Sequence, residues 1–333
     1  MLLLAPLAAA CGGEAESAVE SPSTTFGPVL NPWDTIPADS LYGATAAENV
    51  RITAVEMDLL GIPPGWEGMR IAAISDLQLG LWSGNEAVAE AAVATALASE
   101  PDIVVLLGDY IAAGSELPRL ARILAPLREK LTFAVLGDRD ILTDSLAAQV
   151  TRTLQSVGVR VLRNSALPMA RGGDTALIAG ASPDLIRETV PGQQWILSQI
   201  GIGRPMGILL AHNPIVAAQA GGRRYPAALA GNTFCGSVEV PGTPRLSWLN
   251  SEALPGATVE GAERLYRLGN MVLFVTCGTG YGFVPIRFGA PPEVALITLH
   301  SVLPSDPASA DTVVVDTLIE QYERSMADPE GDG

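Results

Sequence analysis

From residue 50 onward, short runs of apolar and mostly branched residues alternate with longer stretches in which apolar residues recur at helical spacing. The short runs predict strands at residues 69–74, 103–107, 132–136, 159–162, 176–181, 206–211, 227–230, 271–276 and 294–299. The longer stretches predict helices at 86–99, 117–129, 142–156, 193–200 and 214–220. Regular alternation of strands and helices indicates an α/β domain.

The N-terminal part of the chain differs from this pattern. Residues 2–10 form an apolar run that ends in Ala8-Ala9-Ala10-Cys11-Gly12, and a run of that length is an h-region rather than a membrane span. It resembles the signal peptide and lipobox of bacterial lipoproteins, which implies that Cys11 carries a lipid anchor. The alternative is a buried apolar strand with an ordinary cysteine.

The chain is expected to have four parts: a signal peptide with lipobox at 1–11, a disordered linker at 12–48, a folded domain at 49–303, and a linker, terminal helix and acidic tail at 304–333. The linker at 12–48 is rich in Ser, Thr, Pro and Glu, and the terminal helix is expected at 313–326. The N-terminal resemblance implies a protein of the cell envelope. It would be anchored by lipid on the outer face of the cytoplasmic membrane, or lie in the periplasm or outside the cell.

Charge and cysteine usage narrow the possible partners. The chain has 20 Lys and Arg residues against 36 Asp and Glu residues, a formal net charge of −16, and nucleic-acid binding needs clustered positive charge. Nucleic acid is therefore not an expected partner. If Cys11 is acylated, Cys235 and Cys277 remain as a pair in a compartment that permits disulfides. A disulfide and two free buried thiols are both open.

Histidine is scarce, with 2 residues, His212 and His300, in the whole chain. Any site built from several imidazoles is therefore excluded. His300 ends the last predicted strand and has no acidic residue near it in the sequence. We interpret it as a surface or hydrogen-bonded histidine.

Polar residues follow the ends of successive predicted strands. They are Asp76 and Gln78, Asp109, Asp138 to Asp140, His212 with Asn213, and Asn232. Sites in open α/β sheets assemble at the carboxyl ends of strands. Each residue alone is a common turn or helix-capping residue, but five groups in succession favour a functional site.

Five short motifs contain these residues. Ser75-Asp76-Leu77-Gln78-Leu79-Gly80 is similar to SDLHLG, Gly108-Asp109 to a GD motif, Gly137-Asp138-Arg139-Asp140 to GNHD, and Ala211-His212-Asn213 to an isolated histidine motif, while Gly231-Asn232-Thr233-Phe234-Cys235-Gly236 stands where GHTHGG belongs. In this order, and with the ending at 278–293, residues 62–299 resemble the calcineurin-like metallophosphoesterases, in particular a compact bacterial branch. The resemblance implies a four-layer αββα sandwich of two mixed β-sheets, with the site where the strand ends of the two sheets meet.

The resemblance also implies a pair of divalent metals, and this chain departs from the family's ligands. The first metal would take Asp76, Gln78, Asp109 and Phe234. Phe234 has no ligand atom and Gln78 offers an amide oxygen in place of an imidazole, so we expect this site to be degraded. The second metal would take Asp109, Asp138, His212 and Asn232. Such an oxygen-rich set favours Mg²⁺, Mn²⁺ or Ca²⁺ over Zn²⁺, so one divalent metal is expected and a second is not.

Arg139 stands where the family keeps the histidine that assists the leaving group. A guanidinium cannot donate a proton near neutral pH because its pKa lies above about 12. Arg139 can instead hold a phosphate through paired hydrogen bonds, or neutralise the neighbouring aspartates as a salt bridge locked between Asp76 and Asp138. Since converging carboxylates raise each other's pKa, a cation or a proton is expected among Asp76, Asp109 and Asp138.

Two functions are consistent with these departures. The first is a lipid-anchored protein with the metallophosphoesterase fold that acts in binding and has lost most hydrolysis. The alternative is a single-metal-dependent phosphoesterase that hydrolyses a phosphate mono- or diester and contacts the phosphate through Arg139. The expected ligand is a phosphate-containing small molecule or a lipid-linked ligand, and the membrane is contacted through the anchor.

Overall fold

The structure is a computed structural model of the 333-residue chain. It describes residues 50–187, 190–200, 205–219, 225–237, 258–259, 264–283, 285–287 and 289–302. The signal peptide and linker predicted at 1–48, with Cys11, and the C-terminal segment predicted at 304–333 lie outside the described residues. Their boundaries stay predictions.

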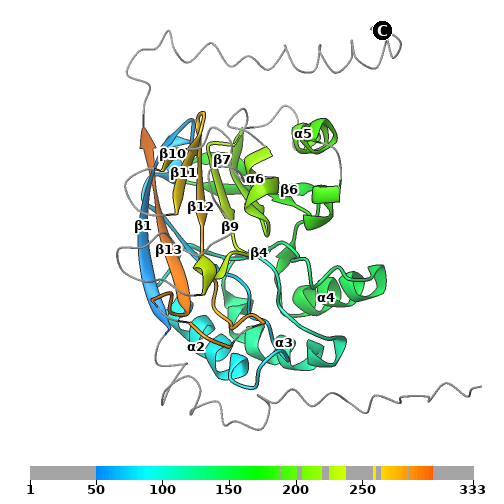
Figure 1. Ribbon diagram of the computed structural model, residues 1–333. Coiled ribbons are helices and arrows are strands. Elements are labelled where there is room, and N and C mark those ends of the chain that lie inside the picture. Colours follow the sequence, from blue (N-terminus) through cyan, green and yellow to red (C-terminus); the bar gives the residue numbers. More distant parts are fainter. Residues whose placement is uncertain are drawn as a thin grey trace, which may run out of the picture. The chain divides into compact units, whose positions relative to one another are not determined.

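The described strands form two mixed β-sheets (Figure 1). One sheet has six strands in the order β1-β13-β2-β3-β4-β5, and the other has seven in the order β10-β11-β12-β9-β8-β7-β6. Each sheet combines parallel pairs with antiparallel ones, such as β13 against β2 and β6 against β7. The strands are β1 (Arg51–Leu60), β2 (Met69–Ile74), β3 (Ile103–Leu106), β4 (Thr132–Ala134), β5 (Arg160–Val161), β6 (Ser165–Arg171), β7 (Asp174–Ala181), β8 (Met206–Ala211), β9 (Ala227–Ala230), β10 (Thr258–Val259), β11 (Leu265–Leu268), β12 (Met271–Val275) and β13 (Glu293–Val302).

Helices cover the outer face of each sheet (Figure 1). The six-stranded sheet packs against α2 (Asn85–Ala98), α3 (Leu117–Leu124) and α4 (Asp144–Ser156), and the seven-stranded sheet against α5 (Val190–Gln199) and α6 (Pro214–Gln219). Short 3₁₀ turns lie at Pro64–Trp66, Gly114–Glu116, Ala125–Glu129, Pro183–Arg187 and Phe234–Gly236. The predicted αββα sandwich of two mixed sheets is confirmed.

The largest core lies between the two sheets. Along β2, Met69, Ile71 and Ala73 face this inner core, whereas Ala72 and Ile74 face the helices. A strand that is buried on both faces needs apolar residues at every position. This explains why the central strands are uninterrupted apolar runs in the sequence.

Local sequence determines where two of the helices begin and end. Thr143 accepts a hydrogen bond from the Leu146 N–H over 3.1 Å, and this cap makes α4 begin at Asp144 rather than at 142 as predicted. The helix predicted at 117–129 ends as α3 at Leu124 and continues as a 3₁₀ turn. Pro126, in the first turn of that segment, lacks the N–H that a continued α-helix would need.

The fold brings the polar motifs to one edge of each sheet. The parallel strands β2, β3 and β4 end together in one sheet, as do β8, β9 and β12 in the other. Every strand predicted from an apolar run is present, whereas β1, β6, β10 and β11 were not predicted. In the part of the chain that the structure describes, no helix has both the length and the apolar composition needed to cross a membrane.

Candidate metal centre

Three buried side chains meet where the strand ends of the two sheets come together. Asp76 follows β2 and Asp109 follows β3 in one sheet, and His212 follows β8 in the other. One ligand atom from each residue lies within 4.8 Å of the other two, and all three residues are buried. Two carboxylates and one imidazole at this spacing are able to hold a divalent cation.

The His212 ring is oriented by the backbone. Its Nδ1 lies 2.8 Å from the carbonyl oxygen of Leu107, and because a carbonyl can only accept, Nδ1 carries the hydrogen. In the neutral ring Nε2 then presents its lone pair beside Asp109 Oδ1, 3.5 Å away. Burial lowers the pKa of His212, but the charges of the neighbouring aspartates outweigh it and raise the pKa to about 9. A metal at Nε2 would take the place of that proton.

Asp76 is held through one of its carboxylate oxygens. Oδ2 accepts hydrogen bonds from the Ser75 hydroxyl at 2.6 Å and from the Asn232 N–H at 3.0 Å. Oδ1 is buried and has no hydrogen-bond partner. Burial raises the pKa of Asp76, as does the charge of Asp109, against the opposing effect of His212. A positive charge at Oδ1 would keep this carboxylate ionised.

Both oxygens of Asp109 accept hydrogen bonds. Oδ1 accepts from the Arg139 N–H at 2.9 Å, and Oδ2 accepts from Gln78 Nε2 at 2.8 Å. Since an ionised carboxylate can only accept, the Gln78 amide must face Asp109 with its nitrogen rather than its oxygen. The amide oxygen Oε1 of Gln78 is buried and has no hydrogen-bond partner.

Within the described part of the chain, three buried side-chain atoms of this site therefore have no hydrogen-bond partner: Asp76 Oδ1, Gln78 Oε1 and His212 Nε2. Buried polar atoms are nearly always paired, and an unpaired one costs about 1–3 kcal/mol. A divalent cation would satisfy oxygen and imidazole acceptors together and balance two buried carboxylates. The residues present thus fit a hard or borderline cation such as Mn²⁺ or Mg²⁺.

Asp138 and Asn232 lie beside this group. Asp138 Oδ2 is 3.9 Å from His212 Nε2 and 3.5 Å from Asn232 Nδ2, and the Asp138 side chain is 47% exposed. The residues predicted for the second metal are therefore neighbours. However, the compact buried group contains Asp76, which the resemblance assigned to the first site, in place of Asp138.

Asp140 supports the site, a role that the sequence analysis did not assign to it although it lies in one of the motifs. Its carboxylate accepts the backbone N–H groups of Asp109 at 2.9 Å, Tyr110 at 3.0 Å and Gly137 at 2.8 Å. Burial and the charge of Asp109 raise its pKa to about 7, against the effect of these hydrogen bonds. Asp140 fixes the backbone that carries Asp109. Its place two residues after Asp138, in the same motif, is the signal that could have identified it.

Arg139 lies between the buried carboxylates and the surface. Its Nε is 3.7 Å from Asp109 Oδ2, and its guanidinium carbon lies 4.5 Å from the centre of the Phe283 ring. The Phe283 side chain is 80% exposed. Arg139 thus pairs loosely with Asp109 and stacks on an exposed ring.

The backbone at the site adopts an uncommon conformation. Asp76, Gln78, Asp109 and Asn232 have φ angles of 58°, 53°, 57° and 69°, in the left-handed region that non-glycine residues rarely adopt. Such conformations cluster at functional sites, where the surrounding structure holds them. Gly137 allows the backbone of Asp109 to lie close to its own, since a Cβ at Gly137 would lie 2.1 Å from the Asp109 nitrogen.

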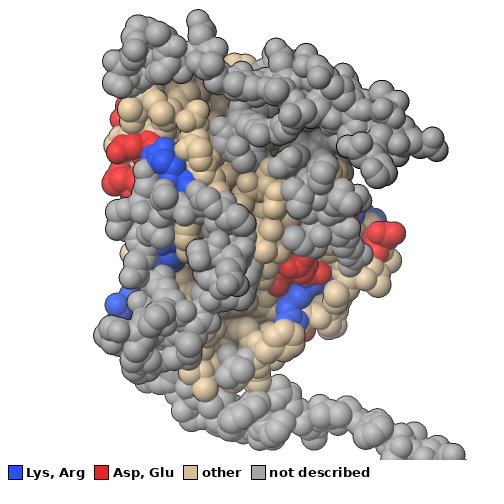
Figure 2. Space-filling model, turned by 45° about the horizontal axis from the view of Figure 1, so that its top comes forward, with Lys and Arg blue, Asp and Glu red and all other residues tan. Residues whose placement is uncertain are grey.

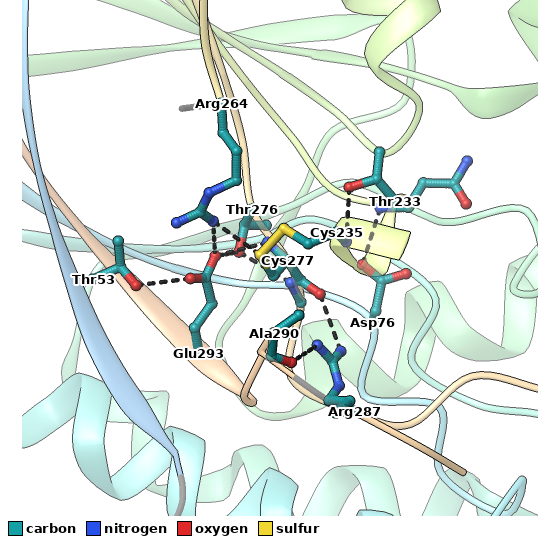
Figure 3. The surroundings of a disulfide bond; sticks show 12 residues. Thr53, Asp76, Thr233, Cys235, Arg264, Thr276, Cys277, Arg287, Ala290 and Glu293 are labelled. Carbon is teal, nitrogen blue, oxygen red and sulfur yellow. Dashed lines mark hydrogen bonds and ion pairs between the residues drawn. A yellow bond between two sulfur atoms is a disulfide. The ribbon is translucent and has the colours of Figure 1, made fainter. Parts of the chain in front are cut away.

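Cys235 and Cys277, which the sequence left open between a disulfide and two free thiols, form a disulfide (Figure 3). Cys235 lies in the loop after β9 and Cys277 in the loop after β12. Both are buried and pack with Ala290. The bond therefore links two of the loops that surround Asp76.

His300, away from this site, has two acidic partners. Its Nε2 is 2.7 Å from Glu56 Oε2, and its Nδ1 is 2.9 Å from Glu67 Oε1. These hydrogen bonds and charges raise its pKa. The interpretation of His300 as a hydrogen-bonded surface histidine is confirmed, although its partners come from distant parts of the sequence.

Part of this architecture matches a known protein family. Residues 69–230 match the family model described as calcineurin-like phosphoesterase. The chain is 25% identical over 247 residues to a Bacillus subtilis (strain 168) protein named uncharacterized metallophosphoesterase YkuE, an alignment that covers 72% of this chain and 82% of that protein.

Two further relatives differ in how much of their length is matched. A Danio rerio protein named transmembrane protein with metallophosphoesterase domain is 28% identical over 277 residues, which cover 78% of this chain and 60% of that protein. The Escherichia coli (strain K12) protein named phosphodiesterase YaeI is 26% identical over 215 residues, which cover 62% of this chain and 74% of that protein.

Proposed function

Because this chain carries a calcineurin-like metallophosphoesterase domain, we propose that it is a phosphoesterase that depends on a single divalent metal ion. One observation carries the proposal: Asp76 Oδ1, Gln78 Oε1 and His212 Nε2 are buried and have no hydrogen-bond partner among the described residues. Without a cation, each of these atoms would stay buried and unpaired, which costs about 1–3 kcal/mol of folding free energy. Mn²⁺, Mg²⁺ and Ca²⁺ suit this donor set better than Zn²⁺ does.

Contacts of Gln78 and Phe234 favour one ion over two. The Gln78 amide nitrogen donates to Asp109 Oδ2 over 2.8 Å, so this oxygen already has one hydrogen-bond donor. Phe234 has no ligand atom, and its ring centre lies 5.5 Å from the guanidinium carbon of Arg287. An arginine charge thus lies beside Phe234, the position that the resemblance assigned to the first ion.

When bound, a divalent ion polarises a phosphoryl oxygen and makes water a nucleophile at neutral pH. Asp76, Asp109 and His212 would hold this ion, with Asp138 and Asn232 beside it. The Asp140 carboxylate would keep the Asp109 backbone in place through its three hydrogen bonds. Arg139 would bind the phosphoryl oxygens and neutralise charge there. Because a guanidinium cannot protonate the leaving group, esters of acidic alcohols should react best.

The ester class follows from one relative and from Arg139. The relative named phosphodiesterase YaeI supports a diester, and the exposed Phe283 ring under the guanidinium offers a surface for the second ester group. We therefore propose a phosphodiester with a flat or apolar alcohol as substrate. A phosphate-containing small molecule or a lipid-linked phosphate would both meet this description.

Hydrolysis of bis(p-nitrophenyl) phosphate in the presence of Mn²⁺ tests the proposal. Wild-type protein should release p-nitrophenol and lose this activity with a chelator, and Asp76→Asn should be inactive. Asp58→Asn, a matched change at an exposed position of β1, should keep full activity. Activity that survives both the chelator and Asp76→Asn would refute the metal-dependent mechanism.

A second candidate is a protein that binds a metal and a phosphate ester without hydrolysis. It is favoured by Arg139, which stands where a proton donor for the leaving group would be expected. The same assay separates the candidates when binding of the diester is measured by calorimetry. Binding that requires Mn²⁺, without release of p-nitrophenol, would select the binding protein.

Location and partners are proposed from the sequence. The apolar run before Cys11 supports a lipid anchor in the cell envelope, and fractionation of a bacterium that expresses the full chain tests it. Wild type should be found in the membrane fraction and Cys11→Ala in the soluble fraction; equal distribution would refute the anchor. Nucleic acid is not a proposed partner. On the face shown in Figure 2, several of the described basic side chains lie next to acidic ones.

A further inference from the structure

Two loops of the seven-stranded sheet contact Asp76 (Figure 3). In the loop after β9, the Asn232 N–H donates to Asp76 Oδ2 over 3.0 Å. In the loop after β12, the Gly280 N–H donates to the Asp76 carbonyl oxygen over 2.7 Å, and a Cβ at Gly278 would lie 2.9 Å from Asp76 Oδ2. Because Oδ2 is fixed in this way, the direction of the unpaired Oδ1 depends on both loops.

The disulfide joins these loops close to their contacts with Asp76. Cys235 follows Asn232 by three residues, and Cys277 directly precedes Gly278. The Cα atoms of the two cysteines are 4.7 Å apart. The bond therefore couples the position of one loop to that of the other.

The Cys277 side of the bond has anchors that do not depend on the disulfide. Glu293, the first residue of β13, accepts hydrogen bonds from the Cys277 N–H and the Thr276 hydroxyl, each at 2.7 Å. Arg264 pairs with the same carboxylate at 2.5 Å, and Arg287 Nη2 donates to the Cys277 carbonyl oxygen at 3.0 Å. Figure 3 shows these side chains converging on the loop. This loop should keep its place when the disulfide is broken.

The loop that carries Cys235 has an unfavourable backbone conformation that the surrounding structure must stabilise. Asn232, Phe234, Cys235 and Ser237 have φ angles of 69°, 50°, 50° and 60°. Non-glycine residues keep such conformations only where their surroundings impose them. The disulfide holds Cys235 in the middle of this run. Without it, relaxation toward ordinary φ angles would carry the Asn232 N–H away from Asp76.

From this geometry we infer that the Cys235–Cys277 disulfide is a positioning element of the metal centre. It holds Asn232 against Asp76, and breaking it lowers metal affinity while the two-sheet core stays folded. The inference rests on the proposed metal-dependent function, because it assigns the disulfide a role at that same site. It also makes metal binding sensitive to thiol reductants.

The reductive step balances as an exchange with a dithiol. The dithiol supplies two electrons and two protons, the S–S bond becomes two cysteine thiols, and the dithiol becomes a cyclic disulfide. Arg264 Nη1 lies 3.2 Å from Cys277 Sγ, where its charge would stabilise a thiolate of Cys277 during the exchange. Both cysteines are buried, so the variant Cys235→Ala/Cys277→Ala is the cleaner way to produce the unlinked state.

Titration calorimetry with Mn²⁺ compares the oxidised wild type with this double variant. Groups that orient metal ligands typically change affinity by 10- to 100-fold, so a loss of at least about tenfold is expected. Asn232→Gly removes the side chain but keeps the N–H, and Gly tolerates φ above zero. When the disulfide is broken in this variant, the change in Mn²⁺ affinity should differ from the change in wild type, because both substitutions act on one loop. Purely additive effects would contradict action through Asn232.

Val272→Ala is the matched control for stability. Val272 is buried in β12, in the core between the sheets, and its truncation lowers the free energy of unfolding without touching either loop. It should leave the Mn²⁺ affinity unchanged. If it lowered affinity as much as the double variant does, the effect would be one of general stability and the inference would be overturned.

Hydrogen exchange on the metal-free protein provides a readout that does not need the proposed function. Breaking the disulfide should speed exchange of the Asn232 amide, which donates to Asp76 Oδ2, while amides within β8 and β9 keep their protection. Unchanged exchange at Asn232, or faster exchange without loss of Mn²⁺ affinity, would overturn the inference. If the wild type bound no Mn²⁺ but exchange at Asn232 still rose, the metal-dependent function would fail and the positioning of Asp76 would stand.

Discussion

Gln78 donates a hydrogen bond from its amide nitrogen to Oδ2 of Asp109 over 2.8 Å, in the buried interior of the site. The contact fixes the amide orientation and leaves Gln78 Oε1 without a donor. Oδ1 of Asp109 accepts the Arg139 N–H over 2.9 Å and lies 3.5 Å from His212 Nε2, so both oxygens of this carboxylate have a donor. In the proposed single-ion site, the ion would lie among Asp76, Asp109 and His212.

Restoring two ligands should restore the second ion. Gln78→His alone adds one imidazole, whereas Gln78→His/Phe234→His also replaces the phenyl ring by a ligand. We expect about one Mn²⁺ per chain in the wild type and in the single variant, and about two in the double variant, because a dinuclear site needs ligands on both sides of the shared aspartate. Native mass spectrometry counts the ions. Two ions in the wild type would contradict the role assigned to Gln78 and Phe234.

Asp140→Asn should destabilise the protein through the Asp109 backbone. An amide in place of the carboxylate turns one acceptor into an NH₂ group that faces backbone N–H donors, and a broken buried hydrogen bond costs about 1–3 kcal/mol. Urea denaturation should show a loss of this size in the free energy of unfolding. Asp58→Asn serves as the exposed control. An Asp140→Asn variant as stable as the wild type would mean that the three hydrogen bonds do not matter.

Arg139→Ala should weaken binding of the diester more than it slows the chemical step. Hydrogen bonds to charged groups contribute about 1.5–3 kcal/mol, which corresponds to roughly a 10- to 100-fold rise in KM. Phe283→Ala, which removes the ring under the guanidinium, should raise KM by a few-fold. Leu142→Ala, another exposed apolar side chain, is the matched control and should have no effect. A fall in kcat at constant KM for Arg139→Ala would assign Arg139 to the chemical step instead.

The ion pairs of His300 should stabilise the domain in a limited pH range. Its folded-state pKa is raised above 6.5, so its contribution is fully present below that pH and is lost as the pH rises through the folded-state value. The pKa of Glu67 is lowered from 4.5 by the Ser301 N–H and by His300. The stability contributed by the ionised Glu67 carboxylate is therefore present above pH 4.5 and is lost as the pH falls through the lowered folded-state pKa. The difference in stability between wild type and His300→Gln should therefore be largest between about pH 4.5 and 6.5.

Urea denaturation of both proteins at several pH values measures this difference. It should shrink as the pH rises above the raised pKa of His300, where the wild-type imidazole loses its charge. A difference that grew with pH would show that His300 stabilises the fold as a neutral ring.

The sequence predicted the central strands closely because both of their faces are buried. β2, β8 and β9 have the bounds that their apolar runs indicated. β1 was missed although Val55, Met57 and Leu59 are buried and alternate with exposed residues, since a strand with one solvent-facing side has no continuous apolar run. Pairing of this strand with β13 involves residues too distant in sequence for a local pattern to show.

The motifs predicted which side chains converge, but not how they are grouped. Asp76 lies with Asp109 and His212, and Asp138 lies farther out, because distances of a few Å depend on how the two sheets pack. Glu293 accepts a backbone N–H, and Arg287 donates to a backbone carbonyl group. Contacts of that kind leave no motif in a single sequence, because the partner position can hold almost any residue.

Anomalous diffraction from crystals grown with Mn²⁺ tests the central claim most directly. The account predicts one strong anomalous peak per chain, within bonding distance of Asp76 Oδ1 and His212 Nε2, and its disappearance in Asp76→Asn. The same crystals would show whether Gln78 Oε1 turns toward the ion. Two peaks on either side of Asp109, or none at saturating Mn²⁺, would contradict it.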